Sequence, residues 1–104
     1  NTIDEYLDRL HDEKPITIRQ CIQSLGIIVP YKPDYINQIK DALMQLDIMS
    51  IKDTMRKSIL LDIINVLLII RDKQNNSGVE PYILNALTGE VLDKKAKKQI
   101  EAVF

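Results

Sequence analysis

The chain has 104 residues, the size of one domain, and a chain of this length can bury a core without disulfides or metals. Its formal net charge of −1 excludes a strong general attraction to nucleic acid or to anionic membranes. The single cysteine excludes an internal disulfide and fits a reducing compartment, so we expect a cytoplasmic protein. Few glycines and many leucines, isoleucines and lysines favour helix over sheet.

The first third of the chain predicts two amphipathic helices. Apolar residues from Ile3 to Leu10 recur at helical spacing, after a sequence at Thr2–Glu5 that has the pattern of a capping box. Pro15 suits the first position of a second helix, because its missing N–H would have no helical partner there. That second helix carries one apolar face, formed by Ile18, Cys21, Ile22, Leu25, Ile28 and Val29.

The middle third predicts a second pair of helices. Pro30 and Pro33 separate it from the first pair, since two prolines so close together cannot continue a helix. The third helix then has an apolar face formed by Tyr35, Ile36, Ile39, Ala42, Leu43 and Leu46. A sequence from Ser50 to Asp53 resembles a helix cap and precedes a fourth helix that runs to about Lys73.

The last third predicts a third pair of helices. The polar segment 73–81 contains Gly78 and Pro81 and is typical of a loop. A fifth helix begins near Glu80, and a sixth covers the tail with four residues facing inward: Leu92, Ala96, Ile100 and Val103. No segment alternates as a half-buried strand would, so we expect an all-α fold in a single domain, residues 1–104.

The fourth helix contains an unusually apolar stretch, ILLDIINVLLII, from Ile59 to Ile70. Ten of its twelve residues are aliphatic. A membrane span needs about 20 apolar residues, so we expect no membrane segment. Buried strands usually have about 4–8 residues, and the two polar residues, Asp62 and Asn65, are three apart, as on one face of a helix. We therefore interpret the stretch as a helix covered by neighbours on nearly every side.

The helix pairs show an internal repeat. The apolar spacing of the first helix returns 36 residues later in the third, and IRQCI at 18–22 returns 37 residues later as MRKSI at 55–59. A third, partial copy begins at Pro81. An apolar residue followed by arginine opens the second helix of a pair, after a turn with proline or polar residues. In these features the chain resembles the HEAT-repeat family of α-solenoids.

The resemblance implies antiparallel helix pairs stacked as a short right-handed superhelix, with units at about 1–31, 33–73 and 80–104. A closed orthogonal bundle is the alternative architecture. Repeat stacks offer extended surfaces to other proteins, so we expect a protein–protein interaction or scaffold module. HEAT units often place an aspartate in the turn before the arginine as part of a polar ladder. The resemblance thus implies Asp12 or Glu13 as the partner of Arg19.

The polar residues of the fourth helix suggest a contact surface. In a HEAT-like stack the second helix of each pair lines the concave inner surface. Five residues fall on one narrow line of that helix, and we define them as the contact strip: Ser58, Asp62, Asn65, Ile69 and Asp72. We interpret this strip as a candidate site for a partner protein. The alternative is that it is only the exposed side of a central helix.

We predict no catalytic residue, no cofactor and no metal site, and therefore no enzyme. His11 is the only histidine and lies in a turn, and Cys21 lies on an apolar helix face, where a small core residue is expected. One histidine and one cysteine cannot form a structural zinc site. We interpret the many carboxylates near the N-terminus as a solvated helix face: Asp4, Glu5, Asp8, Asp12 and Glu13.

A lysine cluster near the C-terminus raises the alternative of nucleic-acid binding. Its members are Lys94, Lys95, Lys97 and Lys98. No aromatic residues are interleaved to stack on bases, so we interpret the lysines as solvated and favoured by the C-terminal end of a helix dipole. Three alternatives to a scaffold remain: an accessory domain of an enzyme system, a nucleic-acid-binding helical repeat, and a bundle that forms a homodimer through leftover apolar surface.

Overall fold

Six α-helices account for most of the chain in a computed structural model that describes residues 2–73 and 78–104. They are α1 (Thr2–Asp8), α2 (Pro15–Ile28), α3 (Ile36–Gln45), α4 (Asp53–Lys73), α5 (Glu80–Thr88) and α6 (Lys94–Val103). Short 3₁₀ helices lie in three connections: Arg9–His11, Pro33–Tyr35 and Ile48–Ser50. The described residues contain no β-strand, which confirms the all-α prediction. Residues 74–77 of the predicted loop lie outside the described residues.

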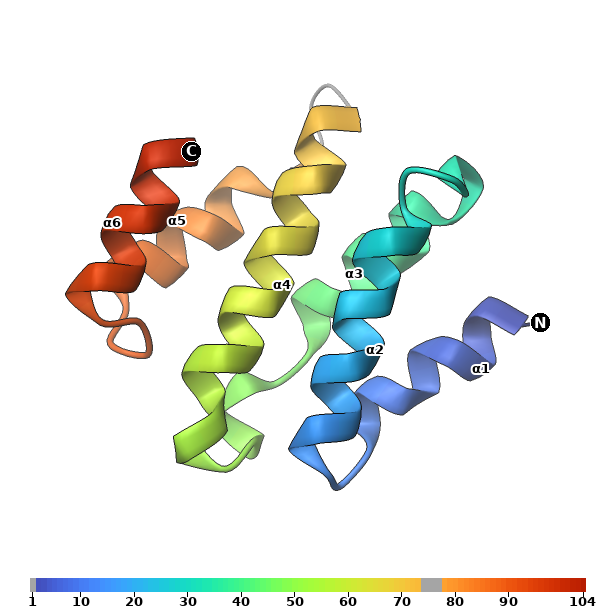
Figure 1. Cartoon of the computed structure of the whole chain (residues 1–104), viewed down its shortest axis with the longest axis horizontal. Helices are drawn as coiled ribbons and strands as arrows, with labels where there is room; N and C mark the ends of the chain where they lie inside the picture. The colour runs from blue at the N-terminus through green and yellow to red at the C-terminus, as the bar shows by residue number, and fades with distance from the viewer. Residues whose placement is uncertain (1, 74–77) are drawn as a thin grey trace.

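The helices form two layers (Figure 1). In the front layer α2, α4 and α6 lie side by side and run in the same direction. Behind them α1, α3 and α5 return toward the end at which the front helices begin. The molecule is a slab of 39 × 34 × 18 Å, with α1 and α6 at opposite ends of its long dimension.

The apolar stretch of α4 lies at the centre of this slab. Five of its side chains have no exposed surface: Ile59, Ile63, Ile64, Leu67 and Ile70. α4 packs mainly against α2 and also against α3. Each large aliphatic side chain buried in this way contributes about 1.5–3 kcal/mol relative to an exposed one. The stretch is helical and largely buried, as its composition predicted.

Polar contacts tie α4 to α6 near both ends. Near the start of α4, Lys57 Nζ donates to Asp93 Oδ2 at 2.6 Å. Near its end, Arg71 donates to the carbonyl oxygens of Phe104 and Val103, at 2.9 and 3.0 Å. The last carbonyls of a helix have no partner within the helix and favour a cation. These two contacts therefore stabilise α6 and hold it parallel to α4.

The starts of α4 and α6 differ from what the sequence indicated, since Ser50 does not cap α4 and Leu92 lies before α6. α4 begins at Asp53, and the Ser50 hydroxyl donates to the carbonyl oxygen of Asp47 at 2.7 Å instead of capping α4. α6 begins at Lys94, where Asp93 Oδ1 accepts from the backbone N–H of Ala96 at 2.8 Å. The capping box predicted at the N-terminus involves the Thr2 side chain, which lies outside the described residues.

The position of the lysine cluster is a correction to the sequence interpretation. Lys94, Lys95, Lys97 and Lys98 occupy the first half of α6 and not its C-terminal end. The helix dipole places positive partial charge at this end, so it opposes the lysines. The lysines lie at the start of α6 because Asp93, the residue just before them, is the N-cap of the helix.

Replacing Asp93 by alanine is expected to lower the melting temperature at neutral pH, because the change removes the helix cap and the contact with Lys57. The Lys57 hydrogen bond, followed by that from the Ala96 amide, holds the pKa of Asp93 below its usual range. A carboxylate with a lowered folded pKa stabilises the fold above its unfolded pKa, and this stabilisation is lost as the pH falls through the folded pKa.

The melting-temperature difference between Asp93→Ala and wild type should therefore shrink as the pH is lowered below about 4. The control is Asp93→Asn, which removes the charge but keeps a residue that caps helices well. It should lie between the other two proteins at pH 7. A difference that stays constant from neutral pH down to about pH 2 would contradict the role of the charge.

Candidate functional site

The residues of the contact strip lie along α4 but differ widely in exposure. Asn65 and Asp72 are exposed, and Ser58 and Ile69 are half-buried. Asp62 is only 9% exposed. The expectation that Asp62 lies on the exposed side of the helix is therefore wrong. The reason is that α2 packs against this part of α4 and covers the carboxylate.

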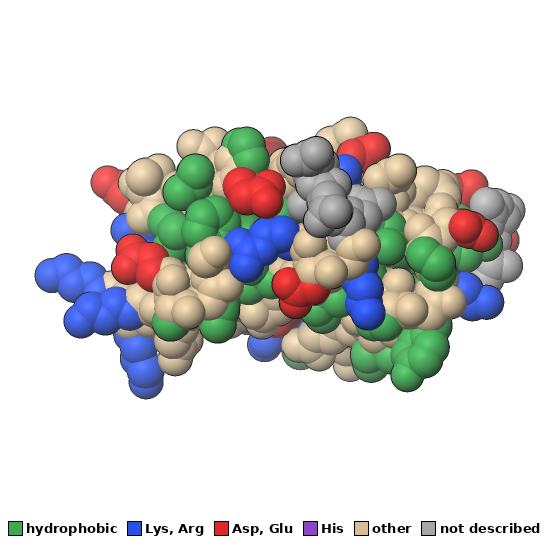
Figure 2. Space-filling view, turned by 90° about the horizontal axis from the view of Figure 1, so that it is seen from above, with side chains coloured by type: hydrophobic (Ala, Val, Ile, Leu, Met, Phe, Trp, Pro, Cys, Tyr) green, Lys and Arg blue, Asp and Glu red, His purple; other side chains and the backbone are tan. Residues whose placement is uncertain are grey.

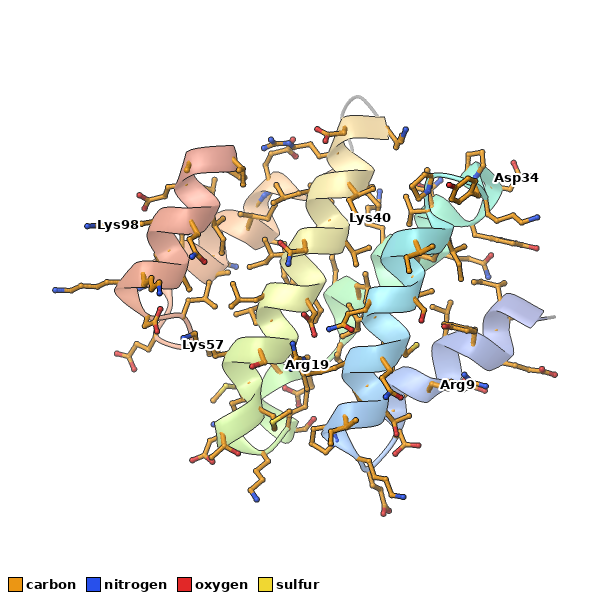
Figure 3. The ribbon with its side chains drawn as sticks, viewed as in Figure 1. Arg9, Arg19, Asp34, Lys40, Lys57 and Lys98 are labelled. Atoms are coloured by element: carbon orange, nitrogen blue, oxygen red, sulfur yellow. The ribbon has the colours of Figure 1, made fainter. Side chains whose placement is uncertain are left out.

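Asp62 forms an ion pair with Arg19 of α2. Arg19 Nε donates to Asp62 Oδ2 at 2.8 Å, and Nη2 lies 3.5 Å from Oδ1. Figure 3 shows Arg19 between α2 and α4. The hydrogen bond with Asp62 raises the pKa of Arg19 against the opposing effect of burial. The Arg19 side chain is 37% exposed and can also be solvated by water, whereas that of Asp62 is only 10% exposed. Loss of the ion pair would therefore destabilise the buried carboxylate more than the arginine.

The partner of Arg19 differs from the one that the HEAT resemblance implied. Asp12 Oδ1 accepts a hydrogen bond from the backbone N–H of Lys14 at 2.8 Å, and so stabilises its own turn. Glu13 is exposed in the same turn. Arg19 reaches instead to the neighbouring front helix, so the expected ladder with Asp12 or Glu13 is wrong for this arginine.

Arg56, the repeat counterpart of Arg19, has a different role. Its Nε donates to the carbonyl oxygen of Ile51 at 2.8 Å and its Nη2 to that of Met49 at 2.9 Å. Both carbonyls belong to the connection before α4. The two arginines share a place in the repeat, but one joins two helices and the other holds its own turn.

A shallow groove of about 260 Å³ runs between α2 and α4, beside the ion pair. We call it the α2–α4 groove, and its lining residues are Gln23, Gly26, Ile27, Asp62, Asn65, Val66 and Ile69. The structure thus brings three residues of the contact strip to one place: Asp62, Asn65 and Ile69. Ser58 and Asp72 are not among the lining residues.

The α2 wall of this groove was not predicted from the sequence. Gly26 permits the close approach of the helices, since a Cβ there would meet Val66 Cγ2 at 3.3 Å and Ile69 Cδ1 at 3.8 Å. Ile27 follows it at the rim and is 67% exposed. A glycine inside a helix, followed by an isoleucine beside the apolar face, is the signal that could have indicated this wall.

The groove combines an apolar wall with polar side chains. Its wall is apolar at Ile69 and Val66, and the side-chain amides of Gln23 and Asn65 can both donate and accept hydrogen bonds. Its one carboxylate, Asp62, accepts a hydrogen bond from Arg19 and is held in an ion pair. The groove can therefore hold an aliphatic side chain and pair with polar groups next to it.

The other candidate reactive residues, Cys21 and His11, lie apart from this groove. Cys21 is 3% exposed, its Sγ donates to the carbonyl oxygen of Tyr6 at 3.3 Å, and burial raises its pKa to about 11. This confirms the interpretation of Cys21 as a core residue. His11 is exposed and borders a hollow of about 480 Å³ between the turns before α2 and α4. Across residues 2–73 and 78–104 no three potential metal ligands come together.

The comparisons with known proteins add no assignment. Neither the protein-family models, nor the curated proteins, nor the solved structures contain a match to this chain. The HEAT resemblance therefore stays a prediction from the repeat pattern. Within the described part of the chain, no helix combines the length and the apolar character that crossing a bilayer requires.

Proposed function

We propose that this chain is a non-catalytic protein–protein interaction module, built of HEAT-like helix pairs, which holds a segment of a partner protein in the α2–α4 groove. The observation that carries the proposal is the composition of that groove. Ile27 from α2 and Ile69 from α4 line one opening, together with the side-chain amide of Asn65 on α4. An apolar centre with polar groups around it is the usual composition of a protein interface.

The size of the groove favours a macromolecular partner over a small ligand. Pockets for small molecules usually measure about 300–1,000 Å³ and enclose most of the ligand. The groove is smaller, at about 260 Å³, and it is open to solvent along the front layer. An extended segment could place one aliphatic side chain between Ile27 and Ile69 and pair its backbone with Asn65 or Gln23.

The front layer supplies the extended surface that such a partner needs. α2, α4 and α6 present adjacent, similarly directed helices (Figure 1), and a stack of repeats binds along such a row. The Arg19–Asp62 pair fixes α2 against α4 and so holds the two groove walls at a constant separation. We place the protein in the cytoplasm, where the reduced Cys21 of the core would persist.

Site-specific photo-crosslinking tests this proposal. A photoreactive amino acid at position 27 should capture a partner protein in cells of the source organism, whereas the same group at position 16 should not. Ile16 is a matched control, since it lies on the same helix and is 66% exposed against 67% for Ile27. It also lies on the same side of α2, about three turns away.

The captured protein is then purified, and its complex with the chain is formed again from the two components. Equal capture from positions 16 and 27, or capture from position 16 alone, would contradict the placement of the partner in the groove. Conversion of a small molecule in place of stable binding would favour the accessory-enzyme alternative.

A further inference from the structure

The helices at the two ends of the slab each expose three charges of one sign, with Arg9 also exposed at the α1 end. At one end three acidic side chains of α1 are exposed, and we call them the acidic face: Asp4, Glu5 and Asp8. At the other end three lysines of α6 are exposed, and we call them the lysine face: Lys94, Lys95 and Lys98. The longest dimension of the molecule, 39 Å, separates α1 from α6. Figure 2 shows Lys and Arg side chains projecting at the α6 end.

Both faces point away from the core and have the same spacing. Ala96 and Ile100 are the buried residues of α6, and at 100° per residue Lys94 and Lys98 lie on its opposite side. Figure 3 shows Lys98 pointing away from the rest of the molecule. Three charges at positions i, i+1 and i+4 occupy about one turn on α1 and on α6 alike. Glu5 and Asp8 can therefore pair with lysines of the other face, whereas Asp4 already accepts a hydrogen bond from Gln38 Nε2 at 3.1 Å.

In the part of the chain that the structure describes, few acidic groups neutralise the lysine face. The nearest acidic residue in sequence, Asp93, pairs with Lys57 at 2.6 Å and also attracts Lys95, so it offsets only part of the lysine charge. Glu101 is the only acidic residue within α6. The positive end of the helix dipole adds to the lysine charges and does not offset them. An external group with several carboxylates would therefore stabilise this end of α6.

Apolar surface is also exposed on α5, the helix before α6, and on the inner side of α1. Leu84 of α5 is 51% exposed. Tyr82 of the same helix faces the connection before α4. Leu84, two residues later, lies on the opposite side of α5. At the other end an apolar hollow of about 170 Å³ borders α1, lined by Ile3, Tyr6, Ile28, Lys32 and Tyr35. Exposed ion pairs contribute only about 0.2–1 kcal/mol each, so an association through the charges is weak and requires a high protein concentration.

From this complementarity we infer that copies of the chain associate head to tail, with the acidic face of one copy against the lysine face of the next. The contact uses different surfaces on the two copies, so each pair still has one free face of each charge. Further copies add until a ring closes or growth stops. The association depends strongly on salt, because the charges are exposed and are screened within about 10 Å at 0.1 M salt.

Sedimentation velocity across a concentration series tests this inference. At about 0.01 M salt the mean mass should rise with concentration above that of the 12.0 kDa monomer. At about 1 M salt it should return to that of the monomer. A monomer at every concentration in low salt would overturn the inference. Association that persists unchanged in high salt would also overturn it, because an apolar homodimer behaves in that way.

Charge-reversed variants identify the faces. Glu5→Lys/Asp8→Lys makes the α1 end basic, and Lys94→Glu/Lys98→Glu makes the α6 end acidic. Each variant alone should stay monomeric at low salt, and an equimolar mixture of the two should associate again. The control Asp41→Lys/Asp72→Lys reverses two exposed acids away from both ends and should associate as wild type does.

Circular dichroism establishes that each variant keeps its helices. The Lys94→Glu/Lys98→Glu protein is expected to fold at least as well as wild type, since acidic residues suit the start of a helix. If this folded variant still associates alone at low salt, the lysine face is not the contact and the inference fails. If the folded variants do not associate when mixed, the pairing of the two faces is wrong.

Discussion

Replacing Asp62 by arginine is expected to lower the free energy of unfolding by about 3 kcal/mol. The change removes a carboxylate that is only 9% exposed and places a second positive charge against Arg19. Breaking a buried ion pair costs about 3–5 kcal/mol, and the lower end applies because Arg19 keeps some contact with water. Chemical denaturation followed by circular dichroism measures the effect.

Asp72→Arg is the matched control for this change, since Asp72 lies on the same helix but is exposed. It should change the free energy of unfolding by no more than about 0.5 kcal/mol. The double variant Arg19→Met/Asp62→Leu should recover most of the lost stability, because an apolar pair can replace a buried ion pair. Equal effects of Asp62→Arg and Asp72→Arg would show that Asp62 is not held as described.

Replacing Leu67 by alanine is expected to lower the free energy of unfolding by about 3 kcal/mol. Leu67 has no exposed surface and lies in the centre of α4, between the layers. Removing a buried leucine side chain loses its transfer free energy and leaves a cavity, at a total cost of about 2–5 kcal/mol. The midpoint of urea denaturation should fall without a change in slope.

The neighbouring residue supplies the control for Leu67→Ala. Leu68 is half-buried, so Leu68→Ala removes the same atoms from a position that water already reaches. We expect it to cost about 1 kcal/mol. If both substitutions have the same effect, α4 is not covered by its neighbours in the way that the two-layer arrangement requires.

The helices were predictable because apolar periodicity is a local property of the chain. Pro15 begins α2, and α4 spans the whole apolar stretch from Ile59 to Ile70. The stretch contains only two polar residues, which is enough for one narrow exposed side of a helix. The other sides were therefore expected to be buried. The start of α6 was not predicted, because the role of Asp93 as the N-cap before the lysines was not recognised in the sequence.

The candidate site was less predictable because it depends on two helices. The contact strip was inferred from α4 alone, and the periodicity of one helix does not show which neighbour covers which turn. Arg19 lies 43 residues before Asp62, and only the packing of α2 on α4 brings them together. For the same reason the groove residues Gly26 and Ile27 had no visible connection with Asn65 in the sequence.

The affinity of the purified complex for two single variants tests the proposed function most directly. Ile27→Asp should weaken binding of the captured partner by at least about tenfold, since a charge then lies at the apolar centre of the contact. Ile16→Asp should stay within about twofold of wild type, and the melting temperatures of both variants should remain unchanged. Equal affinity of the two variants, or a loss of binding only in Ile16→Asp, would contradict a partner held in the α2–α4 groove.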